Sequence, residues 1–416
     1  MEYKNLKEIT TKIASGSTPK GGKNSYTDNG PIALIRSQNI YNNNFIRKGL
    51  AYINNEQAKK LENVEIHKDD ILINITGDSV ARVTMVDSSI LPARVNQHVM
   101  IIRPEESKVN KYYLLAYLSS NTVQKTLIHL ASDGATRPAL TKRDLETFKI
   151  PNLTFKTQEY IGNLLKYINE KIEVNKKVIV NLEGLSQTLF KRWFVDFEFP
   201  DEDGNSYKSS GGEMIESELG EIPKNWSIKT VKEIAESFNS IRKPLSKLER
   251  EKRESIYPYY GATKIIDYVD SYIFDGKYIL VGEDGTVQTE AGNPFIQYVW
   301  GKFWVSNHAH ILKGKLISDE LLMLYLKNIN VAPYITGAVQ PKLNKKNLNS
   351  IKFVIANKET IIKFEDFIKS YFQKIRILNK ENKKLIELRD TLLPKLMSGE
   401  LEIPDDMEVN MGELSI

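Results

Sequence analysis

The sequence predicts an α+β protein built from two mixed α/β domains, related by an internal duplication, and two long helices. In two stretches of the chain, apolar residues recur at the three- and four-residue steps of a coiled-coil seam. A constant shift of 203 residues superimposes these stretches and the loops before them. Short runs rich in β-branched residues, bounded by turn formers, fill the segments in between.

The first predicted domain covers residues 1–151. We expect a short helical opening at 6–14 and a longer helix at 111–130. Strands are expected at 32–36, 71–75, 83–87, 99–103 and 149–151, the last of which is stopped by a proline.

The first long helix lies within residues 152–200. Its proline-free part, 158–194, would span roughly 55 Å at the helical rise of 1.5 Å per residue. The residues predicted to pack along its seam include Ile168, Ile172, Leu182 and Leu189, and the polar Asn175 occupies one seam position. A polar seam residue lowers stability but fixes register. We therefore expect Asn175→Leu to raise the stability of the helix pair and to loosen its register.

The second half of the chain repeats this order. A polar linker at 201–216 leads to a second domain at 217–356, a second long helix at 357–400 and a tail at 401–416. The second seam includes Ile375, Leu378, Leu385 and Leu392, with the polar Asn382 among them. Residues 134–142 align with 337–345 at five identities in nine positions, which indicates a duplication.

Composition limits the classes of function. The sequence contains no run of 18 apolar residues, so it predicts no membrane span, and no apolar signal-peptide core follows Met1. We therefore expect a cytoplasmic protein without membrane contacts. The absence of cysteine excludes disulfides, thiolate metal sites and cysteine nucleophiles. Residues 1–150 carry 21 Lys and Arg against 15 Asp and Glu, and residues 217–356 carry 19 against 15. Basic domains of this kind attract nucleic acid or other polyanions.

No catalytic constellation is found. The loop 16–23 lacks the residues of a phosphate-binding loop, and Asn293-Pro294-Phe295 lacks the second proline of an amino-methyltransferase motif. The Glu381-x-Lys383 spacing resembles a nuclease motif, but it lies inside a long helix. His308 and His310 alone are too few to predict a metal site. We therefore expect a non-enzymatic chain without a metal.

Binding is better supported than catalysis. The loops around Thr136-Arg137 and Gln340–Lys342 occupy the same place in both repeats but differ in their polar side chains. Arginine suits guanine and glutamine suits adenine in the major groove. Basic residues elsewhere suit phosphates, which position a protein on DNA without reading sequence. The further candidates for DNA contact are Ser17, Thr18, Lys20, Lys23, Arg36, Gln38, Asn39, Arg94, Asn96, Gln97, Arg242, Lys243, Asn307 and His308.

Five segments carry a resemblance to a known family. They are 188–197 at the end of the first helix, 217–226 at the head of the second domain, 388–400 at the end of the second helix, and the runs 278–285 and 306–311 inside the second domain. Together with the duplication, they make nearly the whole chain resemble the specificity (S) subunit of type I restriction–modification systems.

The resemblance implies a fold and a role. Each globular repeat would be a target-recognition domain that reads one half of a bipartite, asymmetric site on double-stranded DNA. The two helices would pack antiparallel, would set the gap between the half-sites, and would dock two modification (methyltransferase) subunits. S-adenosylmethionine would be bound by those partners and no cofactor by this chain, and cleavage would need separate restriction subunits.

Two alternatives remain open at this point. The chain could be a coiled-coil scaffold without DNA specificity, in which case its behaviour would be insensitive to salt. It could also be a fused methyltransferase or nuclease, in which case the isolated chain would bind S-adenosylmethionine.

Overall fold

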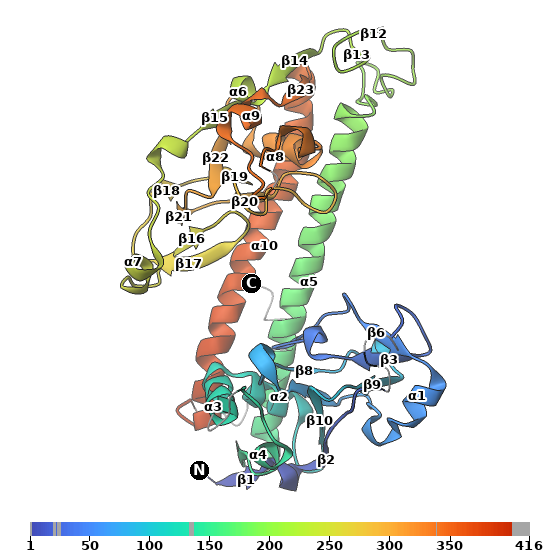
Figure 1. Cartoon of the computed structure of the whole chain (residues 1–416), viewed down its shortest axis with the longest axis vertical. Helices are drawn as coiled ribbons and strands as arrows, with labels where there is room; N and C mark the ends of the chain where they lie inside the picture. Colours follow the sequence, from blue (N-terminus) through green and yellow to red (C-terminus); the bar gives the residue numbers. More distant parts are fainter. Residues whose placement is uncertain (1, 20–21, 23–25, 133–136, 338, 402–416) are drawn as a thin grey trace. The chain divides into compact units, whose positions relative to one another are not determined.

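The computed structural model describes residues 2–19, 22, 26–132, 137–337 and 339–401 (Figure 1). The chain divides into two compact units. Unit 1 comprises Met1–Lys176 and Asn379–Ile416, and unit 2 comprises Lys177–Leu378. Each unit therefore contains one globular repeat and a part of each long helix.

Unit 1 is organised around an antiparallel sheet of order β2-β10-β7-β8. These strands are β2 (Thr10–Ser15), β10 (Val99–Pro104), β7 (Ile71–Asn74) and β8 (Val83–Met85). A second sheet has the order β6 (Ala51–Ile53), β3 (Ile32–Ile35) and β9 (Ala93–Val95), in which β3 and β9 are parallel. Two strand pairs complete the unit: β1 (Tyr3–Asn5) with β11 (Lys149–Pro151), and β4 (Ile40–Tyr41) with β5 (Asn44–Phe45).

The short helices of unit 1 are α1 (Asn55–Lys59), α2 (Lys111–Ser119), α3 (Asn121–Ser132) and α4 (Lys142–Glu146). Asn110 caps α2 by accepting hydrogen bonds from the backbone N–H groups of Tyr112 and Tyr113. Most of α2 is buried, and it packs in one apolar cluster with residues of β7, β10 and the first turns of the first long helix.

Two expectations for this unit were wrong. The segment 6–14 is helical only at Leu6–Ile9, where it forms a 3-10 turn, and Thr10–Ser15 is a strand paired with β10. The expected helix 111–130 is two helices, because Ser120 adopts an extended backbone and its hydroxyl donates to the Tyr117 carbonyl.

Unit 2 repeats this plan. Its antiparallel sheet has the order β15 (Ala235–Ser237), β22 (Ala309–Gly314), β19 (Tyr278–Gly282) and β20 (Ile296–Val299). A second sheet has the order β17 (Ile265–Val269), β16 (Tyr257–Tyr260), β21 (Lys302–Val305) and β18 (Phe274–Asp275), with β16 and β21 parallel. Two strand pairs are β14 (Ser227–Thr230) with β23 (Lys352–Ile355), and β12 (Met214–Ile215) with β13 (Ile222–Pro223). The short helices are α6 (Val231–Ile234), α7 (Lys247–Glu251), α8 (Asp319–Lys327) and α9 (Lys345–Ser350).

The main sheets of the two units correspond strand for strand, whereas the second sheet of unit 2 has one strand more than that of unit 1. The order β2-β10-β7-β8 matches β15-β22-β19-β20, and the parallel pair β3–β9 matches β16–β21. The terminal pair β1–β11 likewise matches β14–β23. The two globular repeats are therefore duplicated in topology as well as in sequence.

The long helices are α5 (Phe155–Phe194), green in Figure 1, and α10 (Lys358–Ser398), orange-red. In unit 1 the Asn169 side chain of α5 contacts Arg389, and the later Asn175 contacts the earlier Asn382, so the helices are antiparallel there. Asn175 Nδ2 donates to Asn382 Oδ1 and to Glu381 Oε2, both at 2.9 Å.

The predicted seam residues are all buried or partly buried. Ile168, Ile172 and Asn175 of unit 1 are buried, as are Ile375 and Leu378 of unit 2 and Asn382 of unit 1. Leu182, Leu189, Leu385 and Leu392 are partly buried.

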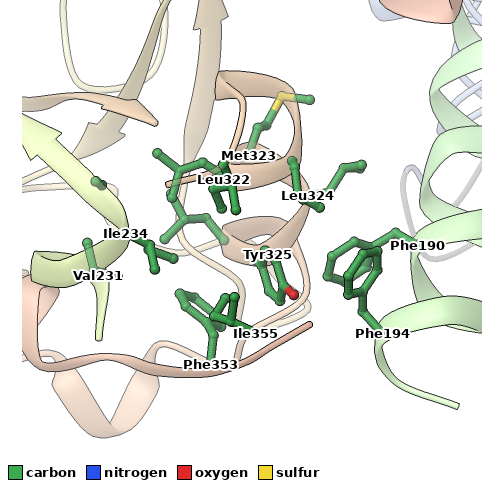
Figure 2. Close-up of a cluster of buried hydrophobic side chains, with 14 of the residues drawn as sticks. Phe190, Phe194, Val231, Ile234, Leu322, Met323, Leu324, Tyr325, Phe353 and Ile355 are labelled. Atoms are coloured by element: carbon green, nitrogen blue, oxygen red, sulfur yellow. The ribbon is translucent and has the colours of Figure 1, made fainter. Parts of the chain in front are cut away.

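The helices of unit 2 are joined by aromatic packing. Figure 2 shows Phe190 and Phe194 pointing toward Tyr325 of α8, with ring centroids 4.9 and 5.4 Å from it. Phe194 also meets Phe364 of α10 edge-on at 4.8 Å. Such aromatic pairs contribute roughly 0.5–1.5 kcal/mol each beyond their buried area.

Each globular repeat is fastened to its long helix in a similar way. In unit 1 the backbone N–H of Asn110, the N-cap of α2, donates to Gln158 Oε1 of α5 at 2.9 Å. In unit 2 the backbone N–H of Ser318, the N-cap of α8, donates to Glu365 Oε1 of α10 at 2.6 Å. Gly162 of α5 permits the close approach in unit 1, since a Cβ there would lie 2.5 Å from Asn110 Oδ1.

Candidate nucleic-acid interface

In each repeat, three segments meet at the end of a central strand. They are the residues after β7 or β19, the turn before β10 or β22, and the loop that follows in sequence at 137–140 or 339–343. We call this arrangement the strand-end cluster.

Equivalent backbone hydrogen bonds build both clusters. Ile75 N donates to His98 O at 3.0 Å, and Leu140 N donates to Ile75 O at 2.8 Å. In the second repeat, Glu283 N donates to His308 O and Leu343 N donates to Glu283 O, both at 2.9 Å. Glu283 therefore stands where Ile75 stands, and His308 stands where His98 stands.

The first cluster holds a chain of side-chain hydrogen bonds. The Thr18 hydroxyl donates to Gln97 Oε1, and Gln97 Nε2 lies 3.2 Å from His98 Nε2. His98 Nδ1 lies 2.7 Å from the Thr76 hydroxyl. A neutral imidazole that accepts at Nε2 carries its hydrogen on Nδ1 and donates it to Thr76. The exposed Gln97 amide is thereby held in one orientation, with capacity left for a ligand.

The second cluster contains ion pairs where the first contains neutral hydrogen bonds. His308 Nδ1 lies 2.7 Å from Asp284 Oδ1. Glu283 Oε2 accepts from Arg242 Nη1 at 2.7 Å, and Glu283 Oε1 lies 3.6 Å from Lys342 Nζ. His310 Nδ1 lies 3.7 Å from Glu283 Oε2.

Burial and charge shift the titration of two groups in this cluster. Burial alone would raise the pKa of Glu283, but the hydrogen bond from Arg242 and the positive charges of Arg242 and Lys342 hold that pKa below its ordinary value. Burial is the main cause that lowers the pKa of His310, and the charges of Arg242 and Lys342 act in the same direction. His310 accepts at Nδ1 from the Asn239 amide at 2.7 Å and donates from Nε2 to the Leu343 carbonyl at 2.6 Å, as a neutral imidazole does.

The structure places most predicted contact residues at the surface. Thr18, Gln97 and Arg137 are exposed in the first repeat, and Asn307, His308, Gln340 and Lys342 are exposed in the second. Ser17, Gln38 and Lys243 are also exposed, while Arg36 is half-buried and shares the Gly49 carbonyl with Gln38. Lys20, Lys23 and Thr136 lie outside the described residues.

Three predicted contacts are buried and serve the fold instead. Asn39 is fully buried, and its amide donates to the Ile46 carbonyl at 2.9 Å. Arg94 donates to the Ala93 carbonyl at 3.0 Å and pairs with Glu65 at 3.3 Å. Asn96 is buried and accepts from the His98 backbone N–H at 3.0 Å, which shapes the turn. We therefore remove Asn39, Arg94 and Asn96 from the candidate contacts.

The Arg242 guanidinium is also committed inside the protein. Besides Glu283, its Nη1 donates to the carbonyls of Asn307 at 3.1 Å and Ala309 at 2.8 Å. Its Nε donates to the Asn239 carbonyl at 3.1 Å. Arg242 thus holds the turn before β22 and is not available as a free phosphate contact.

Sequence reasoning missed the residues that orient the clusters, namely Thr76, His98, Glu283, Asp284 and His310. A signal existed for Thr76, Glu283 and Asp284, because polar residues just after a buried strand commonly carry function at a sheet edge. Among the described residues, no group of three or more His, Asp or Glu side chains is arranged to hold a metal ion. No helix in the described ranges is both long and apolar enough to cross a membrane.

Comparison with known proteins agrees with the architecture. The model of the type I restriction modification DNA specificity domain matches residues 1–184 and again 223–387. The MjaIX specificity subunit of a type I restriction enzyme from Methanocaldococcus jannaschii is 26% identical over 97% of this chain and 94% of its own length. The HindI specificity subunit from Haemophilus influenzae is 24% identical over 89% of this chain and 94% of its own.

A solved structure shows the same fold. The crystal structure of the type I restriction–modification S subunit from M. genitalium superimposes with a TM-score of 0.57 at 18% identity, covering 98% of this chain and 96% of that one. Because the two family-model matches together take in most of the chain, the chain belongs to the type I restriction–modification DNA specificity family.

Proposed function

We propose that this chain is the DNA sequence-recognition subunit of a type I restriction–modification complex, in which each repeat reads one half of a bipartite, asymmetric site. One observation carries the proposal. The two repeats place the same strand-end cluster at the same point of the same topology, but they fill it with different exposed side chains.

The difference in side chains supports an asymmetric site. The first cluster offers the Gln97 amide, whereas the second offers Asn307, His308 and Lys342. Base edges in the major groove are distinguished by donor and acceptor pattern, so different side chains at equivalent places read different bases.

The long helices are proposed to set the gap between the half-sites and to dock two methyltransferase subunits. In support, α5 exposes Val174, Val180 and Leu185, each with more than half of its surface accessible, and α10 exposes Phe367 and Ile377 to a similar extent. A protein partner that packs along the helices would remove these apolar side chains from water.

The chemistry is proposed to reside on those partners. S-adenosylmethionine would be bound by the methyltransferase subunits, and cleavage would need restriction subunits. This chain would supply the choice of sequence. The same proposal puts the assembled complex in the cytoplasm, with its double-stranded DNA.

The test is a methylation assay with co-expressed modification subunits, followed by mapping of the modified bases. Modified adenines in a split, asymmetric site are the expected result. Exchange of residues 1–150 for those of another family member should change one half of the site only. A symmetric site would contradict the proposal that the two repeats read different bases. An assembled chain that binds no DNA and behaves alike at low and high salt would instead support a scaffold.

A further inference from the structure

The second strand-end cluster contains a semi-buried carboxylate that contacts both of its exposed segments. Glu283 is the first residue after β19, and its side chain is 14% exposed. Through its backbone it bonds the turn at His308 and the loop at Leu343. Through its side chain it pairs with Arg242 at 2.7 Å and faces Lys342 at 3.6 Å.

Arg242 extends this contact to the turn before β22. With its Nη1 hydrogen bonds to the carbonyls of Asn307 and Ala309, the guanidinium spans the turn that presents Asn307 and His308. Its charge is balanced by Glu283 on the other side. Removing one member of a partly buried ion pair leaves the other without compensation, so this contact persists only while both charges are present.

The first repeat lacks an equivalent of the Glu283–Arg242 ion pair. Ile75 occupies the place of Glu283, as the matching backbone hydrogen bonds show. By strand register, Met100 occupies the place of His310. The isolated bridges Thr76–Ala139 and Asp284–Lys342 show that Ala139 occupies the place of Lys342. The equivalent positions are therefore apolar, and the first cluster is held by packing and by neutral hydrogen bonds.

From this contrast we propose that Glu283 and Arg242 are positioning residues for the second half-site alone, and that base discrimination there depends on their ion pair. The inference rests on the proposed function, because it assumes that the second repeat reads DNA through Asn307, His308, Gln340 and Lys342. In this arrangement Arg242 contacts no base, and it acts by fixing the turn that does.

The experiment compares assembled complexes of this chain with its modification subunits. Glu283→Gln keeps the shape of the side chain and removes its charge. Glu236→Gln, on the exposed face of β15 in the same sheet, is the matched control. Binding is measured with duplexes that carry one substituted base pair in either half-site, and the half-site of residues 217–356 is first identified by domain exchange.

We expect Glu283→Gln to reduce discrimination at the second half-site by about tenfold, the worth of one good base contact. Discrimination at the first half-site should stay unchanged, and the control should match the wild type in both. A purely structural role would weaken binding to all duplexes equally, without a change in base preference. That result, or unchanged discrimination at both half-sites, would overturn the inference.

Arg242→Lys provides a second route if Glu283→Gln does not assemble. Lysine keeps the positive charge but has a single nitrogen, so it cannot bond the Asn239 carbonyl while it contacts Glu283 and the carbonyls of Asn307 and Ala309. The Arg242→Lys variant should likewise reduce base discrimination at the second half-site only. Wild-type discrimination there would overturn the inference. A wild-type complex without any sequence preference would instead overturn the proposed function itself, so the two failures are distinguishable.

Discussion

Replacement of Asn175 by leucine tests how the helix pair of unit 1 is stabilised. The seam spacing predicted that Asn175→Leu would stabilise the pair, but the structure reverses this expectation. Asn175 is 2% exposed and donates to Asn382, which is 8% exposed, and to Glu381. The single substitution therefore leaves the Asn382 amide buried without its partner.

The magnitude follows from the two opposing effects. An unsatisfied buried polar group costs about 1–3 kcal/mol, and the extra apolar area of one leucine beside a polar amide returns only part of that. We expect a net loss of about 1 kcal/mol, which lowers the melting temperature by about 2–4 °C for a unit of this size. The double variant Asn175→Leu/Asn382→Leu leaves neither amide unpaired and should melt at or above the wild type.

Thermal melts and urea titrations of the wild type, both single variants and the double variant form a double-mutant cycle. The expected coupling energy is about 1–3 kcal/mol. Asn181→Leu, at an exposed position of the same helix, is the control and should change stability by less than about 0.5 kcal/mol. A single Asn175→Leu variant that melts above the wild type would refute the reasoning. The loosened register expected from the sequence now applies to the double variant, in which methylation mapping should find more than one gap length.

Three further outcomes are expected. Gly162→Ala should lower stability by about 1–3 kcal/mol, because its Cβ would meet Asn110 Oδ1 at 2.5 Å, and a thermal melt checks this. Gly184→Ala in the same helix meets nothing within 4 Å and should raise stability by up to about 1 kcal/mol, so equal effects at both glycines would contradict the close approach. Unit 2 should lose stability as pH falls. The unfolded chain protonates His310 at its ordinary pKa of 6.5, whereas burial lowers that pKa in the fold, so stability declines from about pH 6.5 down to the lowered value. Glu283, whose pKa is lowered from 4.5, adds a further loss at more acidic pH. Urea titrations at pH 7.5 and 5.5 test this. Between these two pH values the His310→Met variant should lose less stability than the wild type, because the contribution of His310 is absent.

The long helices and the duplication could be predicted from the sequence because their signals are local and repeated. Seam spacing depends only on helical geometry, and Asn175 and Asn382 were identified as polar seam residues from that spacing alone. Their mutual hydrogen bond was not predictable, since it depends on which residues of the two helices lie opposite each other. The strand Thr10–Ser15 was missed for a similar reason, because its pairing with β10 joins residues about 90 positions apart.

The candidate site was predicted in outline but not in detail. The exposed residues of the turns and loops were found, because polar residues between β-branched runs indicate surface loops. Asn39, Arg94, Asn96 and Arg242 were misassigned because the local sequence around a polar residue gives no indication of a buried partner. Glu65 and Glu283, which compensate the two arginines, lie 29 and 41 residues away in the chain, so only the folded structure brings them into contact.

The fastening of each globular repeat to its long helix has a consequence for how such proteins diversify. Gln158 and Glu365 both accept a hydrogen bond from a backbone N–H group at the start of a short helix. Because nearly every residue type can supply that donor, this hydrogen bond places little demand on the identity of the donating residue. A recombination event that replaces one globular repeat by a divergent counterpart would therefore keep this hydrogen bond, while the exposed turns change freely.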